Sequence, residues 1–237
     1  MTAVEPFPRS ARYDPAWVEQ CRMGPNVLWL CEALCSKLTL RPGMRVLDLG
    51  CGRAASSIFL AREYGLRVFA NDLWISPTEN LARIVEAGLE AEITPIRAEG
   101  HELPYAHGYF DVIVSLDAYH YFGTDDLYLE SVLRFLRPGG ELGIVCPGVA
   151  RELTPDQVPA HLRDLWRAGW HSFHSAEWWG LHWAKTELVD VTNAEALPDS
   201  HAIWQEFAEH TTEAERAAIQ ADRGEFLTFA RTVATKR

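Results

Sequence analysis

The sequence predicts an α/β fold built around a doubly wound, mostly parallel sheet. Strand-like apolar runs alternate with helix-forming runs from Met44 to about residue 147. The first strand leads into a Gly-x-Gly turn, and the second ends in an acid about twenty residues further on. Such alternation predicts right-handed crossovers, helices on both faces of the sheet, and a ligand crevice at the carboxyl ends of the strands.

Five strands joined by helices are expected in this alternating part. The first strand begins at Met44 and ends at Gly50-Cys51-Gly52. The other strands are expected at 67–70, 93–97, 110–116 and 142–145. Pro95 cannot donate a ladder hydrogen bond, so the third strand is placed at the edge of the sheet. The run FDVIVSL at 110–116 is apolar almost throughout, which is typical of a buried central strand.

Turn and capping residues place the helices. Apolar residues at helical spacing predict helices within 15–40, interrupted at Gly24-Pro25. Further helices are expected at 54–64, from the capping box Ser76-Pro77-Thr78-Glu79 to Gly88, and at 124–136.

From Pro147 onward the composition changes. Five of the nine tryptophans lie between Trp166 and Trp183, and four of the nine histidines lie between His161 and His182. The second half is expected to contain helices at 154–169, 175–184, 201–209 and 212–223, with strands at 186–192 and 226–234. We interpret the chain as one domain: 1–40 a helical cap, 41–146 a ligand-binding core, 147–184 an aromatic-rich insertion, and 185–237 the end of the sheet.

Charge and composition exclude several classes of function. The chain has 22 Lys and Arg against 33 Asp and Glu, a formal net charge of −11, which disfavours nucleic acid as the main partner. The five cysteines contain no Cys-x-x-Cys pair, so reduced thiols are expected. No signal peptide and no run of about 18 apolar residues is found, which predicts a cytoplasmic protein without a membrane partner.

Four motifs in order then point to a family. Val46-Leu-Asp-Leu-Gly-Cys-Gly52, Asp72 after a strand, Phe110-Asp-Val-Ile-Val-Ser, and Leu136-Arg-Pro-Gly-Gly resemble class I S-adenosylmethionine-dependent methyltransferases. Within these, the chain is similar to the small-molecule branch that includes ubiquinone and menaquinone methyltransferases. The resemblance implies a Rossmann-like sheet of seven strands with an antiparallel last strand, S-adenosylmethionine as cofactor, and a small-molecule acceptor.

The resemblance also implies roles for particular residues. Gly50 and Gly52 would let the backbone approach the methionine part of the cofactor, and Asp48 would organise that turn. Asp72 would accept hydrogen bonds from the ribose hydroxyls, and Leu73 would lie beside the adenine. The remaining implied contacts are Ala98 and Glu99 near the adenine, and Ser115 and Leu116 near the sulfonium. Ala54 stands where the family has a third glycine, a change that a residue in helical conformation tolerates.

The segment that follows the fourth strand supplies the catalytic candidates. His120 is the candidate base or acceptor-orienting group, with Asp117 and Tyr121 as neighbours. The alternative is that His120 only packs in the structure. Direct transfer of a methyl group needs the acceptor held in line with the sulfonium, and needs a base only when the acceptor must lose a proton.

Several alternatives remain open at this stage. The Gly50-x-Gly52-x-x-Ala55 turn with Asp72 also fits an NAD(P)-dependent oxidoreductase, and a non-catalytic cofactor-binding module is a further possibility. The tryptophan-rich insertion is either a lid over the substrate or ordinary core. His171, His174 and His182 have no recognisable metal-ligand spacing, so no metal is predicted.

Overall fold

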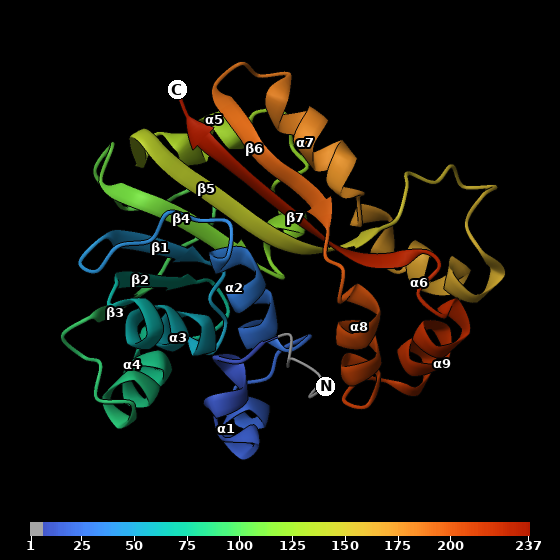
Figure 1. Cartoon of the computed structure of the whole chain (residues 1–237), viewed down its shortest axis with the longest axis horizontal. Coiled ribbons are helices and arrows are strands. Elements are labelled where there is room, and N and C mark those ends of the chain that lie inside the picture. The colour runs from blue at the N-terminus through green and yellow to red at the C-terminus, as the bar shows by residue number, and fades with distance from the viewer. Residues whose placement is uncertain (1–6) are drawn as a thin grey trace, which may run out of the picture.

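The structure, a computed structural model that describes residues 7–237, is built on one seven-stranded sheet (Figure 1). The strand order is β3-β2-β1-β4-β5-β7-β6. The strands are β1 (Arg45–Leu49), β2 (Arg67–Asp72), β3 (Ile93–Arg97), β4 (Phe110–Leu116), β5 (Leu136–Val149), β6 (Val189–Ala196) and β7 (Leu227–Lys236). β1 to β5 pair in parallel, whereas β7 lies antiparallel between β5 and β6. The predicted mostly parallel sheet with an antiparallel last strand is confirmed.

Helices cover both faces of this sheet. They are α1 (Pro15–Gln20), α2 (Val27–Cys35), α3 (Ala55–Tyr64), α4 (Pro77–Glu86), α5 (Tyr128–Leu133), α6 (Arg163–Arg167), α7 (Ala176–Ala184), α8 (Ser200–Ala208) and α9 (Glu213–Asp222). α2 and α3 pack on one face, and α5 and α7 pack on the other, so the buried apolar side chains form two clusters separated by the sheet (Figure 1).

The local sequence signals explain the central elements. β4 is buried along nearly its whole length because helices cover both faces of a parallel sheet. β3 lies at the sheet edge, as Pro95 predicts. The capping box of α4 is present: Ser76 Oγ accepts from the Glu79 N–H at 3.2 Å, and Glu79 Oε2 accepts from the Ser76 N–H at 3.2 Å.

Some predicted boundaries are wrong. Thr154 to Gln157 forms a turn closed by Gln157 N–H to Thr154 O at 2.8 Å, and helical structure begins only at Ala160. The predicted helix 124–136 is limited to α5. β5 begins at Leu136, six residues before the predicted strand, because Leu136 pairs with Phe110 ahead of a register shift. β6 starts three residues later than predicted and continues to Ala196.

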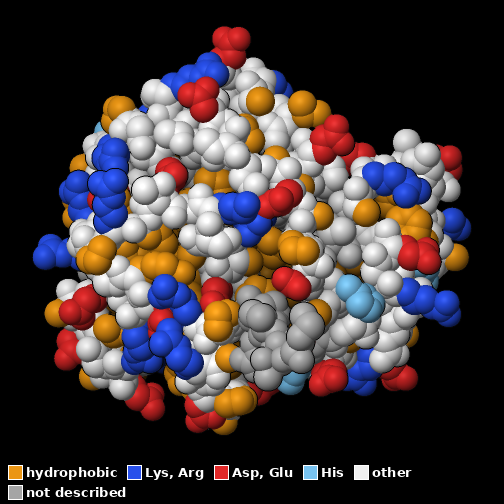
Figure 2. All heavy atoms as spheres, in the orientation of Figure 1, with side chains coloured by type: hydrophobic (Ala, Val, Ile, Leu, Met, Phe, Trp, Pro, Cys, Tyr) orange, Lys and Arg blue, Asp and Glu red, His pale blue; other side chains and the backbone are white. Residues whose placement is uncertain are grey.

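The helices that the structure describes are too short or too polar to span a membrane, and charged side chains of both signs lie on the surface (Figure 2). Within residues 7–237, no helix combines the length and apolar character needed to cross a bilayer. Figure 2 shows acidic and basic side chains interspersed over one face of the molecule.

Candidate functional site

A cavity of about 300 Å³ lies at the carboxyl ends of β1, β2, β3 and β4. The segment between α1 and α2 covers it, with Met23, Gly24 and Pro25 in its wall. The sequence-predicted residues that line the cavity are Gly50, Gly52, Asp72, Leu73, Ala98, Glu99, Leu116, Asp117 and Tyr121. Residues from four separate strand ends therefore meet at one place, as expected for the crevice of a parallel sheet.

The glycine turn is held against the end of β2. The N–H groups of Gly50 and Cys51 donate to Asn71 O at 2.9 and 3.0 Å. Gly50 has φ +78, and a Cβ there would lie 2.4 Å from the Cβ of Ala118. Only glycine combines this left-handed conformation with so close an approach to the β4 loop.

The Asp72 carboxylate holds together the backbone segments that form the cavity floor. Its Oδ2 accepts from the Gly52 N–H at 2.8 Å, and its Oδ1 accepts from the N–H groups of Trp74 and Ile75 at 2.7 and 2.9 Å. A carboxylate has about four acceptor positions, so roughly one remains for a ligand. The carboxylate is fixed before any ligand binds.

Asp48 and Ser115 lie beneath the cavity and not in its wall. The Asp48 carboxylate is buried and accepts from Ser56 Oγ and Ser57 Oγ, both at 2.6 Å. Burial raises its pKa to about 6, and the two hydroxyl donors oppose that rise. Ser115 Oγ donates to Leu49 O at 2.7 Å. Both side chains support the turn from below.

Ala54, at the position of the missing third glycine, is not in a helical conformation. Its φ of 62 and ψ of 17 place it in the left-handed region immediately before α3. The expectation that a helical conformation makes this alanine tolerable is therefore wrong. The chain accepts a strained residue here because Ala54 is fully buried and its carbonyl accepts the first hydrogen bond of α3, from Ile58 N–H.

Glu99 lies in the cavity wall but is paired. Its Oε1 is 2.9 Å from His101 Nδ1, and its Oε2 accepts from the His101 N–H at 2.9 Å. A ligand amino group would compete with His101 for this carboxylate.

The three candidate catalytic residues after β4 do not all face the cavity. Asp117 and Tyr121 line the cavity, whereas His120 does not. The His120 ring is packed edge-on against Phe173 with centroids 5.6 Å apart, and its Nδ1 has no hydrogen-bond partner. Desolvation lowers the pKa of His120 to about 4, so the ring is neutral at pH 7.

Sequence reasoning missed the part of the wall contributed by residues 18–27. Arg22 donates through Nη2 to Glu206 Oε1 of α8 at 2.6 Å, and Arg53 Nη1 donates to Gln20 O at 2.9 Å. These contacts hold the covering segment over the glycine turn. The Gly24-Pro25 break between two amphipathic helices was the only signal of this segment in the sequence.

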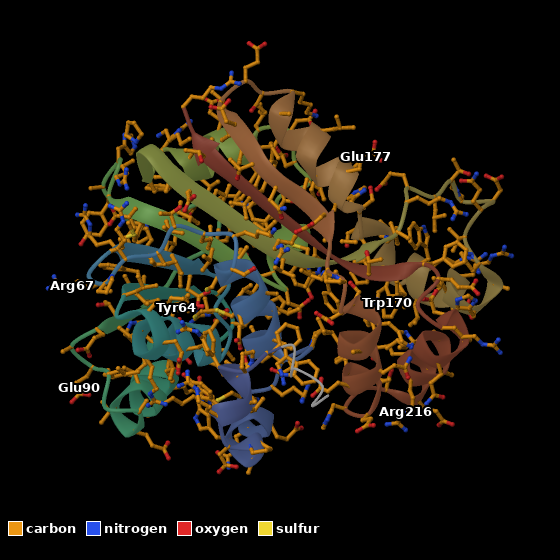
Figure 3. The ribbon with its side chains drawn as sticks, in the orientation of Figure 1. Tyr64, Arg67, Glu90, Trp170, Glu177 and Arg216 are labelled. Atoms are coloured by element: carbon orange, nitrogen blue, oxygen red, sulfur yellow. The ribbon has the colours of Figure 1, made fainter. Side chains whose placement is uncertain are left out.

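The tryptophan-rich segment 147–184 contributes no residue to the cavity wall. Trp179 and Trp183 are fully buried and pack edge-on against Tyr119. Trp170 packs against Trp204 of α8 with centroids 5.6 Å apart, beside the helices at one end of the sheet (Figure 3). Trp179 and Trp183 of this segment therefore belong to the core.

The histidines of this segment contact neighbouring aromatic, acidic and backbone groups. His174 and His182 stack on the two faces of Trp178, with centroid distances of 3.7 and 4.4 Å. His174 Nδ1 is 2.9 Å from Glu152 Oε2, and His171 Nδ1 is 3.0 Å from Trp166 O. No group of three potential metal ligands is found in the part of the chain from residue 7 onward.

Comparisons with known proteins show similarity to methyltransferases. Residues 46–140 match the family model described as a methyltransferase domain. The chain is 30% identical over 146 residues to the glycine/sarcosine/dimethylglycine N-methyltransferase of Actinopolyspora halophila, covering 59% of this chain and 26% of that protein. It is 27% identical over 157 residues to the 27-O-demethylrifamycin SV methyltransferase of Amycolatopsis mediterranei, covering 57% and 58%.

A solved structure agrees over almost the whole chain. Haemonchus contortus phosphoethanolamine N-methyltransferase 2 superposes with a TM-score of 0.75 at 18% identity, covering 99% of this chain and 60% of that one. This likeness establishes the fold. The chain spans 26% and 58% of the length of the two curated relatives named above.

Proposed function

Because the chain belongs to the class I S-adenosylmethionine-dependent methyltransferases, of the small-molecule type, we propose that it methylates a small-molecule acceptor. Transfer would proceed by in-line displacement. The observation that carries the proposal is the cavity itself, where the glycine turn after β1 and the fixed carboxylate of Asp72 after β2 face one space.

The residues present fit the cofactor. Gly50 leaves room that a Cβ would fill, and the carboxylates of Asp72 and Glu99 line the cavity. A cavity lined by acids favours a ligand that carries positive charge and hydroxyl donors, and S-adenosylmethionine carries a sulfonium, an ammonium and two ribose hydroxyls. Bound there, S-adenosylmethionine would supply an electrophilic methyl group.

The roles of the chain's own residues follow from their places in the wall. Asp72 would accept from a ribose hydroxyl, Leu73 and Ala98 would flank the adenine, and Glu99 would accept from its amino group. Gly50 and Gly52 would lie beside the methionine part, and Leu116 would end the strand closest to the reacting atoms. Asp48 and Ser115 would act by supporting the turn from below.

The oxidoreductase alternative fits the sheet poorly. A dinucleotide-binding sheet is typically a mostly parallel sheet of six strands in the order 3-2-1-4-5-6. Here β7 lies antiparallel between β5 and β6. The glycine turn alone does not discriminate between the two functions, so the topology and the comparisons support the methyltransferase.

The test is ligand-induced thermal stabilisation. We expect S-adenosylmethionine and S-adenosylhomocysteine to raise the melting temperature, and NAD(P) to leave it unchanged. In Asp72→Ala the ligand-induced shift should disappear, because the variant loses the ribose acceptor and the three N–H contacts that shape the floor.

A matched control separates binding from folding. Asp111 accepts from the Arg45 N–H at 2.8 Å and from Arg137 Nε at 2.7 Å at the opposite end of the sheet from the cavity. Asp111→Ala should lower the melting temperature while keeping the full ligand shift. A shift with NAD(P) alone, or an unchanged shift in Asp72→Ala, would contradict the proposed function.

A further inference from the structure

Asp117 is held in a strained conformation at the cavity wall. It follows the last residue of β4 and has φ +53, in the left-handed region that is costly for a residue other than glycine. Its N–H donates to Val145 O at 2.8 Å, which extends the pairing of β4 with β5. The next residue, Ala118, is packed against Gly50. The chain on both sides of Asp117 is therefore fixed, and the strain is retained.

The Asp117 carboxylate has no protein partner. Among residues 7–237, no donor and no cationic side chain contacts it, and burial alone raises its pKa to about 7. The side chain is half-buried in the cavity wall, so its carboxylate is accessible from the cavity and free to accept a hydrogen bond from a ligand.

The opposite wall of the cavity leaves space for the Asp117 carboxylate. A Cβ on Gly24 would lie 2.2 Å from Asp117 Oδ2. The covering segment thus brings a glycine to the one point where any side chain would displace the acid. The Asp117 carboxylate therefore lies in the cavity wall, where a ligand can reach it.

Two aromatic rings stand in the same wall. Trp74 and Tyr121 meet edge-to-face with centroids 5.7 Å apart, and 67% and 64% of their surfaces are exposed. Exposed aromatic faces attract cations. The chain also carries a net charge of −11, which favours the approach of a cation from solution.

We propose that Asp117 binds a protonated amine of the acceptor and takes its proton, so that the protein methylates nitrogen. This inference rests on the proposed function and names its substrate class. The proton leaves the ammonium for the Asp117 carboxylate, and the nitrogen keeps the electron pair. That pair forms the new N–CH₃ bond while the electron pair of the broken C–S bond stays on sulfur, and Asp117 afterwards returns its proton to solvent.

The competing role for Asp117 is to hold the amino group of the cofactor. Both roles use the same chemistry, a carboxylate facing an ammonium, but they predict opposite behaviour of cofactor affinity. The Asp117→Asn variant separates them, because asparagine has nearly the same shape, lacks the charge and tolerates the left-handed conformation.

The experiment measures dissociation constants of wild type and Asp117→Asn at pH 8, with and without saturating S-adenosylhomocysteine. The probes are three matched pairs: ethylamine and ethanol, benzylamine and benzyl alcohol, tryptamine and tryptophol. In the S-adenosylhomocysteine complex of wild type, at least one amine should bind tenfold or more tightly than its alcohol. Asp117→Asn should lose that preference while its affinity for S-adenosylhomocysteine changes less than threefold.

Asp164→Asn is the control for net charge, since this α6 side chain is 98% exposed and lies outside the cavity wall. It should keep the amine preference of wild type. Equal binding of amine and alcohol in all three pairs would overturn the inference, and so would a tenfold loss of S-adenosylhomocysteine affinity in Asp117→Asn. If wild type does not bind S-adenosylhomocysteine at all, the proposed function itself fails and the inference falls with it.

Discussion

The glycine turn and the tip of β4 end neighbouring strands at the same edge of the sheet, and they hold their acids in opposite ways. Below and beside the turn, Asp48 accepts from two serine hydroxyls and Asp72 from three backbone N–H groups. At the tip of β4, the Asp117 side chain accepts a hydrogen bond from no residue between 7 and 237. Each region also contains a strained residue, Ala54 in one and Asp117 in the other.

This difference indicates that the glycine turn and the tip of β4 have different functions in the site. Acids that accept several hydrogen bonds from the protein shape a floor that exists before ligand arrives, which lowers the cost of binding a cofactor. An acid without a partner destabilises the empty protein, and it is kept only if a ligand supplies what the fold does not. Substitutions can measure the two behaviours separately.

Asp117→Asn should give the largest change in stability. A carboxyl whose pKa rises on folding from 3.8 to about 7 makes the wild type lose stability as pH increases through that interval. The variant has no such group, so its free energy of unfolding should exceed that of wild type by on the order of 2–4 kcal/mol at pH 8, from about 1.4 kcal/mol per pH unit.

Urea denaturation at several pH values is the measurement. The stabilisation should shrink towards zero as the pH falls below about 4, where Asp117 becomes protonated in both folded and unfolded wild type. A stabilisation that is independent of pH would mean that relief of backbone strain, and not of charge, is responsible.

Ser57→Ala tests the engaged acid. The variant removes one of the two hydroxyl donors to the buried Asp48 carboxylate, and a hydrogen bond to a charged group contributes about 2 kcal/mol. We expect a loss of this size at pH 8 and a smaller one at pH 5, below the pKa of about 6, where Asp48 is largely protonated. Ser131→Ala, at a partly exposed serine of α5 whose hydroxyl donates to a backbone carbonyl and not to an acid, should change stability by less than about 0.5 kcal/mol.

Ala54→Gly tests the strain at the turn. Glycine has no steric penalty at φ 62, so the variant should be more stable by about 0.5–1 kcal/mol. The control is Ala61→Gly inside α3, where glycine should destabilise by about 1 kcal/mol or more. A loss of stability in Ala54→Gly would show that the packing of its methyl group outweighs the strain.

Trp178→Ala should have the smallest effect on the site. The ring lies between His174 and His182 and outside the cavity wall, so the affinity for S-adenosylhomocysteine should stay within about threefold of wild type while stability falls. Calorimetric titration checks this. A larger loss of affinity would restore the interpretation of the tryptophan-rich segment as a lid.

Most of the sheet could be predicted because its signals are local. The alternating apolar runs, Pro95 at an edge and the capping box at Ser76 each depend on a few neighbouring residues. The wrong helix at Thr154 shows the limit of the same logic: Thr-x-x-Gln closes a turn as readily as it opens a helix, and the residues that follow decide between them.

The site could be predicted only in part. Motif order places Gly50, Gly52 and Asp72 correctly in the wall, but it says nothing about which way a side chain points from a strand or loop. Asp48 and His120 are adjacent in sequence to cavity residues and lie behind them. The covering segment with Gly24 comes from the start of the chain, a long-range contact that no local pattern reveals.

The measurement that tests the central claim most directly is a calorimetric titration of S-adenosylhomocysteine into the wild type, Asp72→Ala and Asp117→Asn. We predict one binding site in the wild type, loss of binding in Asp72→Ala, and affinity within threefold of wild type in Asp117→Asn. Binding that survives in Asp72→Ala, or that is lost in Asp117→Asn, would contradict the division of the cavity into a fixed cofactor floor and an unpaired acceptor acid.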